Sequence, residues 1–98
     1  MRYCVVLSPD DNVGTLLQAG KKDDVFSIVS TSLKKLGEIT LLEDIPSTHK
    51  IAVKAIREGE RIIKFSEVIG LASSSIEPGE YAHVHNIVSI AGRAGVRR

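Results

Sequence analysis

The chain has 98 residues, the length of one small domain. Its 13 Lys and Arg residues nearly balance 12 Asp and Glu, and it contains two Tyr, two Phe and no Trp. This balance gives no basic field for nucleic acid, and the few aromatic residues offer little for base stacking. A single small domain is also short of walls for an enclosed active-site pocket, so a partner chain is expected.

The cysteine content and the hydropathy pattern predict a cytoplasmic protein. Cys4 is the single cysteine, so no internal disulfide can form, and its apolar surroundings predict a buried bystander thiol. The apolar run over 3–7 is too short for the hydrophobic region of a signal peptide. No stretch approaches a membrane-spanning length.

In the first half of the chain, β-branched and aromatic runs between polar turns predict short strands. They cover residues 2–7, 12–18, 25–29 and 39–42, with a polar turn over 19–24. The segment 32–37 fits either one helical turn or a hairpin loop, because Leu33 and Leu36 lie three apart and Gly37 could end a helix.

The second half is more regular, and its runs follow Gly or Pro turns. Strands are predicted over 51–53, 61–65, 68–72 and 81–85. Strands this short, joined by sharp turns, predict an all-β fold of compact barrel-like or clip-like form with at most one or two short helical turns. We expect one domain over 1–91, followed by a basic, flexible tail over 92–98.

A weak internal repeat supports this fold. The pattern Ile-x-x-Gly-Glu begins at Ile56 and again at Ile76, twenty residues later, and Ile45 begins a degenerate copy without its glycine. The pattern indicates one turn design, with an apolar anchor, two polar residues and a glycine where φ is positive. Chance similarity between turn-rich segments is the alternative for two such short matches.

His83 and His85 are the first candidates for chemistry. On a strand their side chains would share one face, where they could chelate a metal ion or converge on an anion, while Val84 would face the core. Asn86 adds an amide at the end of this run. The alternative is that the two histidines are ordinary half-exposed polar residues of a strand.

His49 and Lys50 are the second candidates. If the strands that follow these turns are neighbours, His49 approaches the pair His83 and His85, and the three imidazoles could form a metal site with open positions. His49 could equally act as a general base or acid. Lys50 offers a cation for a carboxylate or a sulfonate. The carboxylates of the turns, such as that of Asp11, are expected to bind backbone groups.

The ordered series of motifs resembles one family. Residues 45–52, 56–65, 68–70 and 78–86, together with Asp11-Asn12-Val13-Gly14, are similar to the SAF domain of altronate and galactarate dehydratases. That domain also occurs as the separate small subunit of such enzymes and of sulfolactate sulfo-lyase. The resemblance implies a SAF-type β-clip fold, lyase chemistry on a 2-hydroxy acid, a divalent metal such as Fe²⁺ and a larger catalytic partner chain.

The resemblance also implies roles for particular residues. The family's Gly-His-Lys motif corresponds to Thr48-His49-Lys50, and its His-x-His-Asn motif corresponds to residues 83–86. This implies His49 as a catalytic residue, His49 with His83 and His85 as metal ligands, and Lys50 and Asn86 as substrate-binding residues. Thr48 replaces the family's glycine, a departure that bears on the turn before His49.

The function expected from the resemblance is that of a small subunit of an altronate-like sugar-acid dehydratase, a hydro-lyase subunit that is inactive alone. Presence of the second histidine motif disfavours the galactarate branch. A sulfolactate sulfo-lyase subunit is the second interpretation. The third is a non-catalytic β-clip module that binds an anionic carbohydrate or organises a complex. Self-association into a homo-oligomer is a further candidate interaction.

Overall fold

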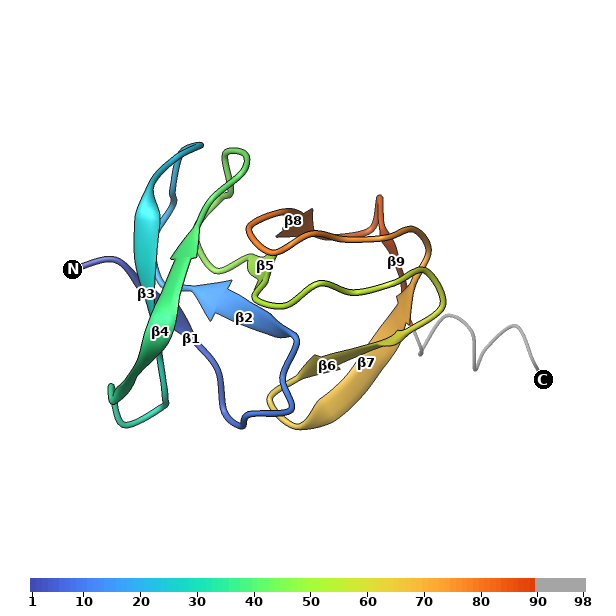
Figure 1. Cartoon of the computed structure of the whole chain (residues 1–98), viewed down its shortest axis with the longest axis horizontal. Coiled ribbons are helices and arrows are strands. Elements are labelled where there is room, and N and C mark those ends of the chain that lie inside the picture. The colour runs from blue at the N-terminus through green and yellow to red at the C-terminus, as the bar shows by residue number, and fades with distance from the viewer. Residues whose placement is uncertain (90–98) are drawn as a thin grey trace.

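The computed structural model describes residues 1–89 of the chain, and this part contains nine strands and no helix (Figure 1). The strands are β1 (Tyr3–Val5), β2 (Val13–Leu16), β3 (Val25–Val29), β4 (Lys35–Thr40), β5 (Lys50–Ala52), β6 (Arg61–Lys64), β7 (Glu67–Ala72), β8 (Tyr81–Ala82) and β9 (Ile87–Ser89). The all-β, β-clip expectation is confirmed. The expected tail over 92–98 and the domain boundary after 91 lie outside the described residues.

The strands form two sheets; in Figure 1 the larger extends from the left of the ribbon to its middle, and the smaller lies on the right. The larger has the order β4-β3-β1-β2-β5-β8, and the smaller has the order β6-β7-β9. All neighbouring strands are antiparallel except β1 and β3, which are parallel. In residues 1–89 no helix exists that could cross a bilayer.

Strand β3 has the predicted bounds. Of the two structures predicted for the segment 32–37, the hairpin loop is the one that forms. Ser30 and Lys34 close the loop through a backbone hydrogen bond of 2.9 Å, and β4 has already begun at Lys35. The helical turn is therefore absent there. Leu33 and Leu36, whose spacing suggested that turn, are exposed loop and edge residues.

The core consists of two clusters, and β2 and β5 contribute to both. The first cluster includes Leu16 and Ile51, whereas the second includes Val13 and Ala52. Successive residues of a strand point to opposite faces, so Ile51 and Ala52 pack into different clusters. Cys4 belongs to the first cluster and is fully buried, as predicted.

One turn recurs four times, and each copy has a positive φ at its fourth residue. The copies begin at Gly20, Ile45, Ile56 and Ile76, and the residues with positive φ are Asp23 (77°), Thr48 (65°), Gly59 (89°) and Gly79 (96°). In each copy the fifth residue donates its N–H to the carbonyl of the second residue, at 3.0 or 3.4 Å. Positive φ at the third position of such a four-residue turn defines type II.

The predicted turn design is therefore confirmed at Ile56 and Ile76, and the degenerate copy at Ile45 keeps the turn by placing Thr48 in the left-handed region. The copy at Gly20 was recognised only as a polar turn. The four turns are joined in pairs, because Gly20 forms an antiparallel bridge with Ile45, and Ile56 forms one with Ile76.

Asp11 connects the start of the chain to the hairpin of β6 and β7. Its carboxylate is 2% exposed and accepts hydrogen bonds from the N–H groups of Leu7, Ser8, Phe65 and Ser66. The expectation that the turn carboxylates bind backbone groups is thus confirmed for Asp11. The two hairpin donors come from residues with φ of 51° and 66°, so Asp11 holds a turn that non-glycine residues rarely adopt.

Candidate functional site: histidines around Tyr81

His49 occupies a position in its turn that carries a carboxylate in the other three copies. In those copies the carboxylate accepts a hydrogen bond from the backbone N–H three residues earlier. The pairs are Asp24 with Lys21 at 2.9 Å, Glu60 with Arg57 at 2.6 Å and Glu80 with Glu77 at 2.5 Å. In the His49 turn the corresponding earlier residue is Pro46, which has no N–H. The His49 side chain therefore has no backbone N–H within its turn to accept from, and it is free for other contacts.

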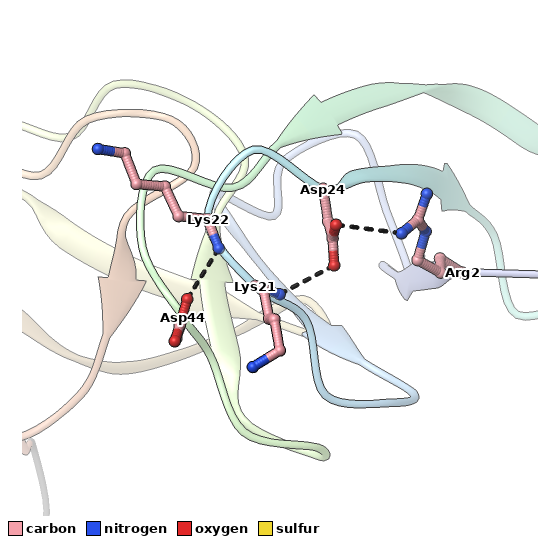
Figure 2. A network of polar contacts seen from close by, with 5 residues as sticks. All are labelled: Arg2, Lys21, Lys22, Asp24 and Asp44. Atoms are coloured by element: carbon pink, nitrogen blue, oxygen red, sulfur yellow. Dashed lines mark hydrogen bonds and ion pairs between the residues drawn. The ribbon is translucent and has the colours of Figure 1, made fainter.

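The turn at Gly20 shows what the His49 turn lacks (Figure 2). Asp24 accepts the Lys21 N–H and also pairs with Arg2 at 3.2 Å, while Asp44 accepts the Lys22 N–H at 2.9 Å. The carboxylate of Asp24 in this turn is thus engaged with the backbone and with Arg2. The side chain of Asp24 therefore stabilises its own turn, whereas the side chain of His49 makes no such contact within its turn.

Tyr81 is the centre of the candidate site. Its hydroxyl lies 2.5 Å from Nδ1 of His49. Its ring stacks on that of His83, with centroids 5.3 Å apart and planes 8° apart, and it lies 5.7 Å from the ring of His85. The rings of His49 and His83 are 5.2 Å apart. The structure therefore brings the three predicted histidines together.

Sequence reasoning counted Tyr81 only as an aromatic residue and did not place it in the site. A signal for it was present. The strand predicted over 81–85 would place Tyr81 on the same face as His83, because residues two apart on a strand share a face.

The loop after Tyr81 corrects the prediction of a strand over 81–85. Strand β8 ends at Ala82, and residues 83–86 form a turn. Val84 was expected to face the core, but its side chain is 79% exposed. The expectation that His83 and His85 share a strand face is therefore wrong, although both still reach Tyr81.

Asn86 explains why the strand stops. Its side chain is 4% exposed; Oδ1 accepts the N–H of His83 and Nδ2 donates to the carbonyl of Tyr81, both at 2.9 Å. A side chain that bonds to nearby backbone groups offers them an alternative to the sheet. The amide predicted to bind substrate is thus buried and engaged with its own loop, which gives Asn86 the role of fixing the positions of Tyr81 and His83.

Lys50 lies beside the histidines at a pocket of about 250 Å³. The pocket is lined by Lys50, Ile69, His83, Val84, Ile87 and Ser89. Partial burial and the charge of Lys64 lower the pKa of Lys50. Partial burial and the charges of Lys50, His49 and His85 lower the pKa of His83.

Burial is the largest cause of both shifts, and the gathering of groups that can carry positive charge is the second. Neither recorded salt bridge within residues 1–89 involves Lys50 or Lys64. Positive groups held together without a neutralising carboxylate favour an anion, since the anion relieves their mutual repulsion.

The described residues do not form a metal site by themselves. Within residues 1–89, no three side chains among His, Cys, Asp and Glu are arranged to hold a metal ion together. The three histidines surround the ring of Tyr81, and one imidazole nitrogen of His49 already faces the phenol. This donor set does not fit a resident metal in this chain alone.

Known proteins resemble this chain over almost its whole length. Residues 2–90 match the family described as "Altronate/galactarate dehydratase SAF domain". Altronate dehydratase of Bacillus subtilis is 33% identical over 86 residues, which are 88% of this chain and 16% of that protein. The (2R)-sulfolactate sulfo-lyase subunit alpha of Chromohalobacter salexigens is 32% identical over 84 residues, which are 85% of this chain and 89% of that subunit.

A shorter match is closer in sequence. The (2R)-sulfolactate sulfo-lyase subunit alpha of Paracoccus pantotrophus is 42% identical over 48 residues, which are 49% of this chain and 72% of that subunit. The chain thus spans about a sixth of the Bacillus subtilis dehydratase but most of the two sulfo-lyase subunits. With the family match over residues 2–90 and the all-β structure, these likenesses show that the chain belongs to the altronate/galactarate dehydratase SAF domain family.

Proposed function

We propose that this chain is the small subunit, or the SAF domain, of a lyase that acts on a 2-hydroxy acid together with a larger catalytic chain. The family match over residues 2–90 supports the lyase assignment. The full-length likeness to a protein named as a subunit alpha supports the existence of a partner. The observation that carries the proposal is the cluster of His49, Tyr81, His83 and Lys50, in which groups for proton transfer lie beside groups for anion binding.

In this proposal Lys50 and His83 receive the carboxylate of the substrate. Both line the pocket of about 250 Å³, and an anion there would stabilise the charged forms that burial and the neighbouring positive groups disfavour. Ile69 and Ile87 form apolar walls of the same pocket, which strengthen an ion pair by excluding water.

His49 transfers a proton in the elimination. Loss of water from a sugar acid with hydroxyl groups on both C2 and C3 breaks the C–H bond at C2 and the C–O bond at C3. A base takes the C2 proton, the C=C bond forms, and the hydroxide leaves C3 with a proton from an acid. His49 is suited to one of these proton transfers because its ring is half-buried, positioned by Tyr81 and beside the anion pocket. The larger chain supplies the remaining catalytic groups.

Fe²⁺ or another divalent ion in the assembled enzyme stays a prediction. Residues 1–89 do not make a metal site alone, so most ligands of such an ion would come from the partner. When bound, the ion would polarise an oxygen of the substrate. The proton transfer proposed for His49 does not depend on this ion.

Sulfite elimination from a sulfolactate is the second candidate. It is favoured by the length comparison, because the chain covers 89% of the Chromohalobacter salexigens sulfo-lyase subunit but 16% of the Bacillus subtilis dehydratase. The anion pocket fits either substrate, since each carries a carboxylate on a carbon with a hydroxyl group. Only the leaving group differs.

The test is co-purification and assay with the large lyase chain encoded in the same genome. The two chains are co-expressed with a tag on the large chain, and the complex is assayed with altronate, galactarate, other aldonates and sulfolactate, with and without Fe²⁺. We expect turnover of one substrate class by the complex and none by either chain alone. In the complex, His49→Ala is expected to reduce kcat by roughly 100-fold or more, whereas Lys21→Ala, in the first turn, is expected to leave it unchanged.

Turnover by this chain alone would contradict the subunit assignment. A complex that forms but turns over none of these acids would favour the non-catalytic module. Unchanged turnover in His49→Ala would remove His49 from the chemistry.

A further inference from the structure

The bond between Tyr81 and His49 determines more than position, because an imidazole has two nitrogens and a partner at one fixes what the other can do. Nδ1 of His49 faces the Tyr81 hydroxyl at 2.5 Å. A neutral imidazole carries its proton on either Nδ1 or Nε2, and the hydrogen bond at Nδ1 decides which.

Either atom of this pair could carry the proton, and the chemistry of the two groups favours the phenol as the donor. An unprotonated imidazole nitrogen is a stronger base than a phenol oxygen, and a phenol with a pKa of about 10 keeps its proton at neutral pH. Among the hydrogen bonds of residues 1–89, the Tyr81 hydroxyl has His49 as its recorded partner.

Tyr81 is held in place to make this bond. Its backbone N–H donates to the Glu43 carboxylate at 3.0 Å, and its carbonyl accepts from the Asn86 side chain at 2.9 Å. Its ring stacks on His83 with planes 8° apart. These contacts fix the backbone and the ring plane, so the hydroxyl is directed at His49 without a large loss of entropy on bonding.

Pro46 makes Nδ1 of His49 available. In the three other turns the side chain at the position of His49 is a carboxylate that binds the earlier N–H. Pro46 provides no such N–H, so no backbone donor of the turn competes with Tyr81.

We propose that Tyr81 is a positioning residue that holds His49 as the tautomer with its proton on Nε2, so that His49 presents a proton donor to the substrate. This deepens the proposed function and rests on it for the identity of the substrate. It assigns His49 to the acid side of the elimination, where Nε2–H donates a hydrogen bond to the departing oxygen. If that proton is transferred, Nδ1 takes the proton of the Tyr81 hydroxyl, so that His49 stays neutral and no imidazolate forms. This tautomer also disfavours His49 as a metal ligand through Nε2. A nitrogen that binds a metal needs a free lone pair, so Nε2 would have to lose its proton to Nδ1, and Nδ1–H would then need an acceptor better than a phenol.

The direct test uses the full chain without its partner. The chain is labelled with ¹⁵N, and long-range ¹H–¹⁵N correlations of its three imidazoles are recorded at about pH 8.5, roughly two units above the usual imidazole pKa. The spectra of His49→Asn, His83→Asn and His85→Asn assign the signals. We expect the wild-type proton of His49 to reside on Nε2.

Tyr81→Phe keeps the ring and removes only the hydroxyl. We expect the ratio of the Nε2–H to the Nδ1–H form of His49 to fall by about fivefold, the equivalent of one neutral hydrogen bond of about 1 kcal/mol. Tyr3→Phe, which alters the other tyrosine of the chain, is the matched control and should leave the ratio unchanged. A wild-type proton on Nδ1, or an unchanged ratio in Tyr81→Phe, would overturn the proposal.

The second measurement uses the assembled enzyme. We expect Tyr81→Phe to reduce kcat by about tenfold, less than the loss of the acid itself, with KM nearly unchanged. If the tautomer ratio changes and kcat does not, the tautomer assignment stands and the catalytic role of His49 is refuted. If both stay unchanged, the positioning role of Tyr81 is refuted while the lyase function is untouched.

Discussion

Removal of the Asp11 carboxylate should be among the most destabilising single changes outside the apolar core. The side chain is 2% exposed and accepts four backbone N–H groups, two of them at 2.8 Å, from Leu7 and Ser66. In Asp11→Ala these donors lose their acceptor, and the hairpin turn with two positive φ values loses its support. The bonds from Leu7 and Ser66 account for most of the lost stability, because the bonds from Phe65 at 3.1 Å and Ser8 at 3.4 Å are longer and weaker.

Hydrogen bonds to a charged group contribute about 1.5–3 kcal/mol each, so the two short bonds together set the cost of Asp11→Ala at about 3–6 kcal/mol. A small domain has a free energy of unfolding of roughly 5–15 kcal/mol, so this loss is a large part of it. The corresponding fall in Tm is about 12 °C or more for a domain of this size.

The assay is urea unfolding followed by circular dichroism, together with thermal unfolding. Asp10→Ala is the matched control, because Asp10 is exposed in the same turn and only its backbone N–H enters a recorded hydrogen bond. That variant should remain within about 0.5 kcal/mol of the wild type. Equal unfolding midpoints for the two variants would refute the argument that the Asp11 carboxylate holds the two parts of the fold together.

Four further substitutions test the turns and the core. Thr48→Gly should raise the free energy of unfolding by about 0.5–1 kcal/mol in the same urea assay, because glycine relieves the left-handed φ of 65° but costs more chain entropy; a loss would show that the threonine is not strained. Gly59→Ala should cost about 1–2 kcal/mol through its φ of 89° alone, since an added Cβ meets open space. Gly79→Ala should cost about 2–5 kcal/mol because its Cβ would also overlap the backbone carbonyl of Thr40, the last residue of β4; equal losses would contradict this difference. Burial raises the pKa of the Cys4 thiol to about 12 from an ordinary value of 9.0. The unfolded chain therefore releases this proton first, and stability should fall as the pH rises above 9, a slope that Cys4→Ala should reduce.

The fold could be predicted because its turns are encoded locally. Gly59 and Gly79 mark positions where φ is positive, and a regular spacing from the isoleucine anchors identifies the turn. The copy at Gly20 escaped recognition because glycine replaces the apolar anchor and Asp23 adopts the positive φ without being glycine. A pattern of residue types identifies a turn whose positive φ is adopted by glycine, and it misses a turn in which another residue adopts that φ.

The site could be predicted in its members but not in its geometry. The spacing of His83 and His85 suggested a strand, yet the Asn86 side chain captures the backbone of this segment and ends β8 at Ala82. That competition depends on the three-dimensional position of one amide. The pairing of Tyr81 with His49 joins residues 32 apart in the chain and could not be read from local spacing.

Strand β5 links the candidate site to the cooperativity of the whole domain. His49 and Lys50 lie directly before Ile51 and Ala52, which pack into the two different core clusters. Neither cluster can loosen without moving this strand, so we expect the two halves to unfold in one transition, and slow hydrogen exchange to extend along β5. An imidazole at the end of such a strand keeps its place through the thermal fluctuations of either half, a rigidity that suits the proton transfer proposed for His49.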